Sequence, residues 1–227
     1  YSQADAMPWL PEIHQPGPLD GIIQEGLTGE RNLFWMREKA DEFGWRNFGE
    51  LWADHETLEH DNDDSLVSHY NNQYDPIYGF SRQYIQTGDE CWLELMDNLA
   101  KHVIDIDIYH TDQDRPEYNR GLFWHTDHYL DGRHCSHRTF SKHHMDIDHV
   151  EQSGGGPANE HCYTSGLMMH YFMTGNSASK QAVIQLAKWA KLSNEGSNTL
   201  VERLVDFLRK DIPAIKHMLK NGYVFKY

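Results

Sequence analysis

Histidines gather in one part of the chain: seven of its sixteen lie between positions 125 and 149. Residues 121–144 read GLFWHTDHYLDGRHCSHRTFSKHH, so imidazoles are interspersed there with acidic, aromatic and basic side chains. Histidine exchanges protons near neutral pH and is the commonest metal ligand. The segment therefore indicates a metal site, a loop for acid–base catalysis and substrate binding, or a polar segment that packs against a partner.

The metal hypothesis rests on two His-x-x-His pairs in this segment. A zinc ion needs three or four ligands at fixed geometry, and we do not take a His-x-x-His pair alone as sufficient evidence of a metal. We therefore expect no resident cofactor and keep a divalent metal as the lesser alternative. Its candidate ligands are His125, His128, His134 and His137.

Charge and composition limit what the chain binds. Its 227 residues, 39% of them hydrophobic, suffice for a sizeable core. The formal net charge of −15 argues against nucleic acid and anionic membranes, which are bound through clustered Lys and Arg. The sequence contains no apolar run of about 18 residues, so we expect no membrane-spanning helix. Three cysteines without a CxxC pair do not indicate a disulfide framework.

Apolar residues recur with a helical period over several segments. The first starts with acidic residues at 89–90, where a helix N-terminus favours negative charge, and carries an apolar stripe to Val103. Two more cover residues 178–191 and 199–210, and a short helix with Pro213 in its first turn follows them. These segments predict an all-α fold.

Strand signals are weak throughout the sequence. The nearest is IDIDIY at residues 104–109, which we interpret as a continuation of the preceding helix. Residues 44–56, GWRNFGELWADHE, fit either a short amphipathic helix or an aromatic-rich loop. Four of the eight prolines lie in residues 1–20, so we expect an extended arm there.

Residues 78–102 resemble residues 165–189 at a constant offset of 87 positions. Gly79 aligns with Gly166, and a Thr-Gly pair followed by Asp or Asn recurs at the same offset. Each copy predicts an αα-hairpin, in which the Asp or Asn caps the second helix. One hairpin cannot bury both faces of its helices, so copies pack side by side.

We expect three such hairpins: one ending near position 109, one in the middle, and one ending near position 192. The predicted domains are residues 1–43, an extended arm and first helix, and residues 44–227, repeated αα-hairpins that form an incomplete α/α toroid. A complete toroid needs far more residues than this. We therefore expect the chain to be part of a longer protein.

Three motifs, GWRNFGELWADHE, GLFWHTDHYLDGRHCSHRTF and GGGPANEHCYTSGLMMHYFMTGN, add a family resemblance. With the repeat, they make residues 44–189 resemble the α/α-toroid domains of polysaccharide lyases and glycoside hydrolases. The likeness is greatest to the helical domain of exo-rhamnogalacturonan-lyase-like proteins. It implies a toroid that follows a β-rich domain, a polysaccharide or oligosaccharide partner, and a secreted or periplasmic location.

In a toroid, the loops before the first helix of each hairpin open at one mouth, so their residues converge. Elimination from a uronic-acid sugar needs a base for the proton beside the carboxylate, and donors that stabilise the charge developing there. We predict four catalytic proton carriers: His125, His137, His161 and Tyr163. The predicted substrate-binding residues are Tyr70, Asn72, Trp124, His134, Arg138, Asn159 and Glu160.

Two other functions stay open. A glycoside hydrolase on the same scaffold needs two carboxyl groups about 5 to 9.5 Å apart, which Asp75, Asp127 and Glu160 could supply. A non-catalytic helical domain that binds glycan or protein is the third hypothesis. The negative net charge opposes a polyanionic substrate unless basic residues at 133–142 make the cleft locally positive.

The remaining chemically active side chains are interpreted as structural. His102, His110, His170 and His217 lie on or near predicted helices, where we expect satisfied core or surface positions. Cys135 and Cys162 are expected to be small buried side chains rather than nucleophiles.

Overall fold

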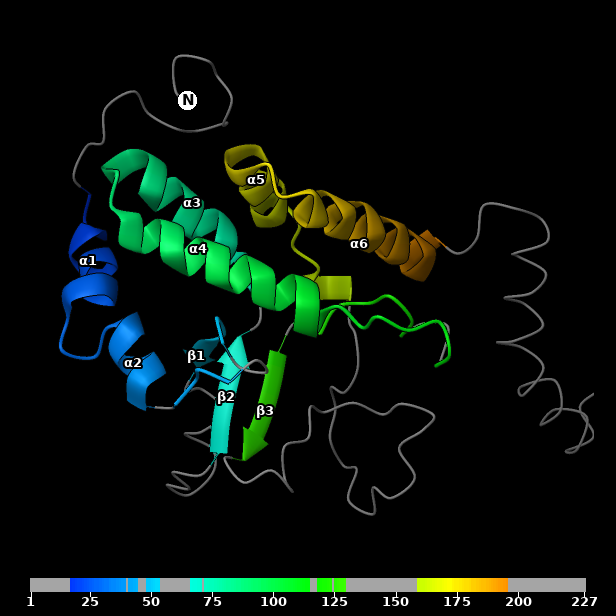
Figure 1. Cartoon of the computed structure of the whole chain (residues 1–227), viewed down its shortest axis with the longest axis horizontal. Helices are drawn as coiled ribbons and strands as arrows, with labels where there is room; N and C mark the ends of the chain where they lie inside the picture. The colour runs from blue at the N-terminus through cyan, green and yellow to red at the C-terminus, as the bar shows by residue number, and fades with distance from the viewer. Residues whose placement is uncertain are drawn as a thin grey trace, which may run out of the picture. The chain divides into compact units, whose positions relative to one another are not determined.

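The computed structural model describes residues 17–39, 41–44, 48–53, 66–70, 72–114, 118–123, 125–129 and 159–195 (Figure 1). Most of these residues are helical, as predicted. Contacts divide the chain into two compact units, Tyr1–Ala187 and Lys188–Tyr227. The division predicted at residue 44 stays a prediction. The helical elements are α1 (Asp20–Thr28), α2 (Leu33–Lys39), α3 (Pro76–Thr87), α4 (Glu90–His102), η2 (Val103–Asp107), η3 (Asn159–His161), α5 (Ser165–Thr174) and α6 (Ser177–Glu195).

The turn of the first predicted hairpin recurs in the second, bond for bond. Gly88 and Gly175 both adopt the left-handed conformation, with φ of 70° and 72°, which glycine reaches at little cost. Their N–H groups donate to the carbonyls of Tyr84 and Tyr171, at 2.7 and 2.8 Å. The predicted helix–turn–helix segments are therefore confirmed as α3–α4 and α5–α6, and α3 packs against α4 as a hairpin requires.

The cap of each second helix also recurs. The Asp89 carboxylate accepts from the N–H of Cys91 at 2.9 Å, and the Asn176 side chain accepts from the N–H of Ala178 at 3.0 Å. Both are the expected N-cap bonds, which satisfy a donor that the helix itself leaves without a partner.

The core of the first unit lies where α3 packs against both α4 and α5 (Figure 1). Ile77 from α3, Leu95 and Leu99 from α4, and Leu167 from α5 are each at most 1% exposed. Full burial of one such side chain stabilises the fold by about 1.5 to 3 kcal/mol. The apolar stripe predicted for residues 89–103 is thus the buried face of α4.

Helix α4 ends in a wider turn. At η2, the N–H of Ile108 donates to the carbonyl of Val103 at 3.1 Å, a bond that spans five residues instead of four. Ile108 then forms an isolated antiparallel bridge with Leu122. The prediction that IDIDIY continues the preceding helix is confirmed through Asp107, although the turn is of the π type.

The described residues also contain a small sheet that the sequence did not predict. Strands β1 (Leu51–Ala53), β2 (Leu66–Tyr70) and β3 (His125–Tyr129) form an antiparallel sheet in the order β1-β2-β3. Neither interpretation of residues 44–56 anticipated β1, and His125–Tyr129 is a strand where a loop was predicted. The strands are short, and local patterns hold little information about pairings between distant segments.

Several predicted elements fall outside the described residues. These are the arm up to residue 16, most of the middle hairpin, and both helices predicted after residue 198. The helix predicted for residues 178–191 is confirmed as α6. Where one helix was predicted before residue 44, there are two, α1 and α2.

The repeat-related glycines Gly79 and Gly166 give a matched test of how closely α3 and α5 pack. A Cβ on Gly166 would lie 2.5 Å from the backbone N of Tyr78 and 2.6 Å from the Cβ of Ile77, whereas one on Gly79 would meet nothing within 4 Å. We expect Gly166→Ala to destabilise the fold by about 1 to 3 kcal/mol through overpacking.

The matched variant Gly79→Ala should leave the stability of the fold unchanged or raise it by up to about 1 kcal/mol. Gly79 is exposed on α3, and alanine has a higher helix propensity than glycine. Urea unfolding followed by far-ultraviolet circular dichroism measures both. Equal effects of the two substitutions would mean that α3 and α5 do not approach each other at Gly166.

Candidate functional site

The loops that lead into α3 and α5 lie side by side, as the convergence hypothesis requires. The side-chain Nδ2 of Asn72 donates to the backbone carbonyl of Tyr163 at 3.2 Å. Asn72 is 0% exposed, so it cannot contact a substrate. Asn72 was predicted to bind the sugar, but it holds the two loops together instead.

Asp75 joins the same two loops. Its Oδ2 accepts from the N–H of Gly166 at 2.9 Å, and its Oδ1 accepts from the N–H of Tyr78 at 3.4 Å. One carboxylate thus caps α3 and ties the beginning of α5 to it. Burial raises the pKa of Asp75, while the hydrogen bonds from Gly166, Tyr78 and Asn72 oppose that rise.

An aromatic cluster stands where the two loops meet. The ring of His161 lies 6.3 Å from that of Tyr74, edge to face, and 6.3 Å from that of Tyr163, centroid to centroid. His161 and Tyr163 are half-buried, and Tyr74 is 70% exposed. A predicted base and a predicted acid therefore lie close together with partial access to solvent.

The backbone at this cluster is strained. Tyr74 and Asp75 both have positive φ, 64° and 56°. For a side chain as bulky as tyrosine, this left-handed conformation costs of order 1 kcal/mol or more and persists only where its surroundings enforce it. The bonds of Asp75 enforce it here, and they leave Tyr74 turned outward.

Strand register brings a third predicted residue to the same region. Tyr70 pairs with His125 across β2 and β3, and Leu51 pairs with Tyr70 on the other side. The backbone of His125 thus lies beside that of Tyr70, and Tyr70 precedes Asn72 by two residues in the chain. For Tyr70, His125, His128 and Glu160 the structure describes the backbone only, and Asn159 lies at the start of η3. Trp124, His134, His137 and Arg138 lie outside the described residues.

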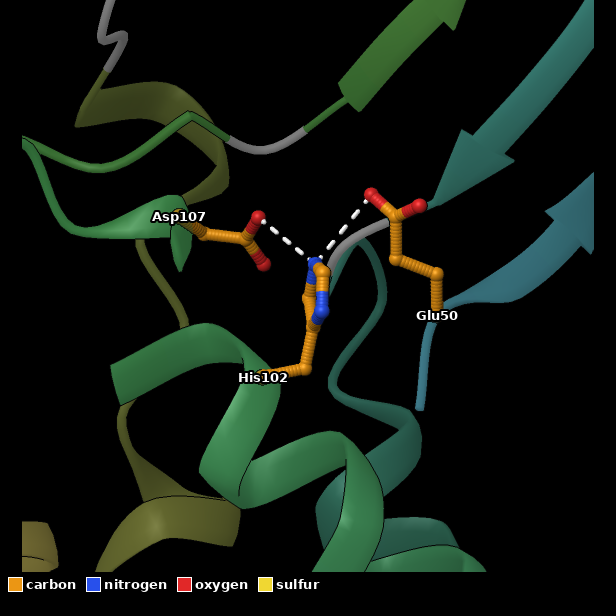
Figure 2. A group of neighbouring side chains, drawn as sticks. All are labelled: Glu50, His102 and Asp107. Atoms are coloured by element: carbon orange, nitrogen blue, oxygen red, sulfur yellow. Dashed lines mark ion pairs between the residues drawn. The ribbon is translucent and has the colours of Figure 1, made fainter. Parts of the chain in front are cut away.

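A second cluster, which the sequence did not predict, is buried at the end of α4. It consists of Glu50, His102 and Asp107, the set of described residues that could hold a metal ion (Figure 2). The Nε2 atom of His102 lies 3.2 Å from Oε1 of Glu50 and 3.1 Å from Oδ1 of Asp107. The three residues are 3%, 3% and 1% exposed. We call them the buried triad.

The orientation of the imidazole is fixed from the other side. Nδ1 of His102 lies 3.1 Å from the carbonyl oxygen of Phe48, an acceptor only, so Nδ1 carries the proton that is donated. Nε2 lies within 3.2 Å of one oxygen from each carboxylate but makes no well-aligned hydrogen bond with either. Burial by itself would lower the pKa of His102, but Asp107 and Glu50 together raise it well above its usual value.

Two backbone features assemble the buried triad. In a regular α-helix of about 100° per residue, Asp107 would lie about 140° around the axis from His102. The π turn at η2 alters this spacing and brings Asp107 next to the imidazole. Gly49, with φ of 93°, lets the segment before β1 approach α4, because a Cβ there would clash with the backbone of Asn98.

The sequence could have signalled the buried triad only weakly. His102 was interpreted as a structural core residue, and Glu50 and Asp107 were not singled out. The available signal was an acid five residues after a helical histidine, which becomes a neighbour only if the helix widens. Glu50 comes from a distant segment, so no local pattern connects it to His102.

His170 and His110 occupy the structural positions predicted for them, whereas Cys162 is half-buried rather than buried. His170 is fully buried between Oγ of Ser179, at 2.6 Å, and Oδ1 of Asp97, at 3.0 Å. His110 contacts the carbonyl of Ile104. Burial raises the pKa of Cys162 to about 11, so its thiol is a poor nucleophile at neutral pH.

Replacement of Asp75 tests whether one carboxylate joins the two loops. We expect Asp75→Ala to destabilise the fold by about 2 to 4 kcal/mol, because it removes a helix cap and a charge-assisted bond to Gly166. The control Asp89→Ala removes only a cap, for about 1 kcal/mol. Chemical unfolding of both variants gives the comparison, and equal losses would contradict the joining role.

The raised pKa of Asp75 also predicts a pH effect. Because the folded-state pKa lies above the unfolded value, the contribution of this carboxyl group is greatest below its ordinary pKa of about 3.9 and falls as pH rises through the folded-state value. The free energy of unfolding of Asp75→Asn should not show this decline. It is measured for the wild type and the variant between pH 3 and pH 7, and parallel pH dependences would contradict the raised pKa of Asp75.

No known protein family, no curated protein and no solved structure matches this chain. Among the described residues, no helix is both long enough and apolar enough to cross a membrane. What the chain does is therefore inferred from its own residues.

Proposed function

We propose that this chain is a carbohydrate-active domain, a polysaccharide lyase that cleaves a uronic-acid-containing glycan by β-elimination. One observation carries the proposal: the ring of His161 lies 6.3 Å from that of Tyr74 and 6.3 Å from that of Tyr163, where the loops before α3 and α5 meet. His161 and Tyr163 are the proposed proton carriers, and Tyr74 is a proposed platform for a sugar ring.

The chemistry of this cluster suits elimination better than other reactions of glycans. The base must remove a weakly acidic proton beside a carboxylate, and an acid must protonate the leaving oxygen; imidazole and phenol groups perform both roles in a half-buried site. Exposed aromatic faces such as that of Tyr74 stack on sugars. His125, whose backbone lies beside Tyr70, is the third proposed proton carrier.

The proposal extends to the architecture and to the substrate. The first helices of both hairpins, α3 and α5, pack against each other, as neighbouring inner helices of an α/α toroid do. The likeness to exo-rhamnogalacturonan-lyase-like domains points to an acidic glycan. Two proposed substrate-binding residues, His134 and Arg138, and the proposed proton carrier His137 lie outside the described residues.

Hydrolysis receives less support from the described residues. Asp75, one of three carboxyl groups named for that reaction, accepts hydrogen bonds from Gly166, Tyr78 and Asn72. A carboxylate so occupied serves as a structural cap and is not positioned to protonate a glycosidic oxygen.

The test is incubation of the full chain with a panel of acidic and neutral polysaccharides. Elimination creates a conjugated double bond that absorbs in the ultraviolet, and a parallel assay counts new reducing ends. We expect both signals with one acidic glycan. Tyr163→Phe and His161→Ala should lower kcat/KM by roughly 10² to 10⁴-fold, the usual range for a lost acid or base.

Tyr171→Phe is the matched control, because Tyr171 lies in the adjoining helix α5 and packs under the Lys180 ammonium, away from the aromatic cluster. Its activity should equal that of the wild type. Reducing ends without ultraviolet absorbance would identify a hydrolase instead. Silence in both assays, with unchanged glycan binding by Tyr163→Phe, would identify a non-catalytic binding domain.

A further inference from the structure

We propose that Glu50, His102 and Asp107 bind one divalent transition-metal ion of the zinc class, and that this ion joins the segment before β1 to the end of α4. The site differs from the predicted His-x-x-His site and from the aromatic cluster of the proposed lyase. The inference rests on the geometry of the buried triad and does not depend on the reaction.

Two distances within the buried triad, those from the imidazole to each carboxylate, match those of neighbouring ligands on one ion. Zinc lies about 2.0 to 2.2 Å from imidazole nitrogen and carboxylate oxygen, so two ligand atoms that subtend about 90° to 109° are roughly 3.0 to 3.4 Å apart. Nε2 of His102 lies 3.2 Å from the Glu50 oxygen and 3.1 Å from the Asp107 oxygen. The ligand atoms of all three lie within 4.8 Å of one another.

The tautomer of His102 is the one that a metal requires. Metal-binding histidines commonly donate the second ring N–H to a carbonyl or carboxylate, which leaves the other nitrogen with its lone pair. Nδ1 of His102 donates to the carbonyl of Phe48, and Nε2 faces the two carboxylates without an aligned hydrogen bond. Nε2, the nitrogen that would bind the ion after losing its proton, therefore faces both carboxylates (Figure 2).

The donor set also selects the kind of ion. Imidazole is a poor ligand for magnesium and calcium, and carboxylates without thiolate do not favour copper(I), which leaves zinc, manganese, iron(II) and similar ions. The burial of all three ligands excludes a substrate from the ion. Its role is accordingly structural, and it stabilises the fold by the free energy of metal binding.

The experiment uses the full chain, stripped with a chelator, dialysed and titrated with zinc chloride alone. Elemental analysis should find at least one tightly bound equivalent per chain, and thermal unfolding should shift upward. The near-isosteric variants Glu50→Gln and Asp107→Asn should each weaken the tight site at least tenfold, a range typical of damaged metal sites.

Two controls separate this site from others. His170→Gln alters an equally buried histidine that faces a single carboxylate, so it should keep the tight zinc equivalent. His134→Ala with His137→Ala removes one of the two predicted His-x-x-His pairs and should keep the tight zinc equivalent too. Loss of the equivalent in that double variant, with retention in Glu50→Gln and Asp107→Asn, would overturn the proposal.

A spectroscopic readout covers the case in which the variants do not fold. In the zinc-loaded wild-type chain, the nitrogen resonances of His102 should show a deprotonated, metal-bound Nε2 and a protonated Nδ1. An imidazolium signature that zinc leaves unchanged would overturn the proposal and identify the buried triad as a protonated ion-pair cluster.

Discussion

The contact between the Asp75 carboxylate and the N–H of Gly166 is the constraint on which the described fold depends. It holds the first helices of two hairpins so close that no side chain fits at Gly166. The same carboxylate begins α3 and keeps Tyr74 and Asp75 in left-handed backbone conformations. This one contact therefore explains the capping of α3, the packing of α3 against α5 and the outward position of Tyr74. The aromatic cluster lies beside it.

Local chemistry made the hairpins predictable. A glycine that ends a helix, a threonine before it and an Asp or Asn after it specify a turn within four residues, and the 87-residue offset shows the turn twice. The sheet was missed because its strands are short and pair with segments elsewhere in the sequence, as Leu66 does with Tyr129, so their pairing depends on burial rather than on local pattern. The convergence of the loops that contain Asn72 and His161 was predicted. Asn72, however, was predicted to bind the substrate, whereas it donates a hydrogen bond that joins the two loops.

The two helix–turn–helix segments share the same turn but carry different side chains at equivalent positions. The position of His102 is occupied by Trp189 in the second copy, and that of Asp75 by Cys162. The turn bonds are conserved between the copies because they are made by the backbone and by Thr, Asp and Asn side chains beside it. The ionisable groups lie at positions that the turn does not constrain, so His102 has no counterpart in the second copy and His170, which aligns with Gln83, has none in the first.

The π turn after α4 has a consequence for how this chain changes over generations. A π turn holds one residue more than the α-helical turn it replaces. Removal of a single residue between positions 103 and 107 would restore regular winding and place the acid four residues after His102, about 40° around the helix axis. A three-nucleotide deletion at this turn would thus change the winding of the helix without moving the acid off the face that carries the imidazole.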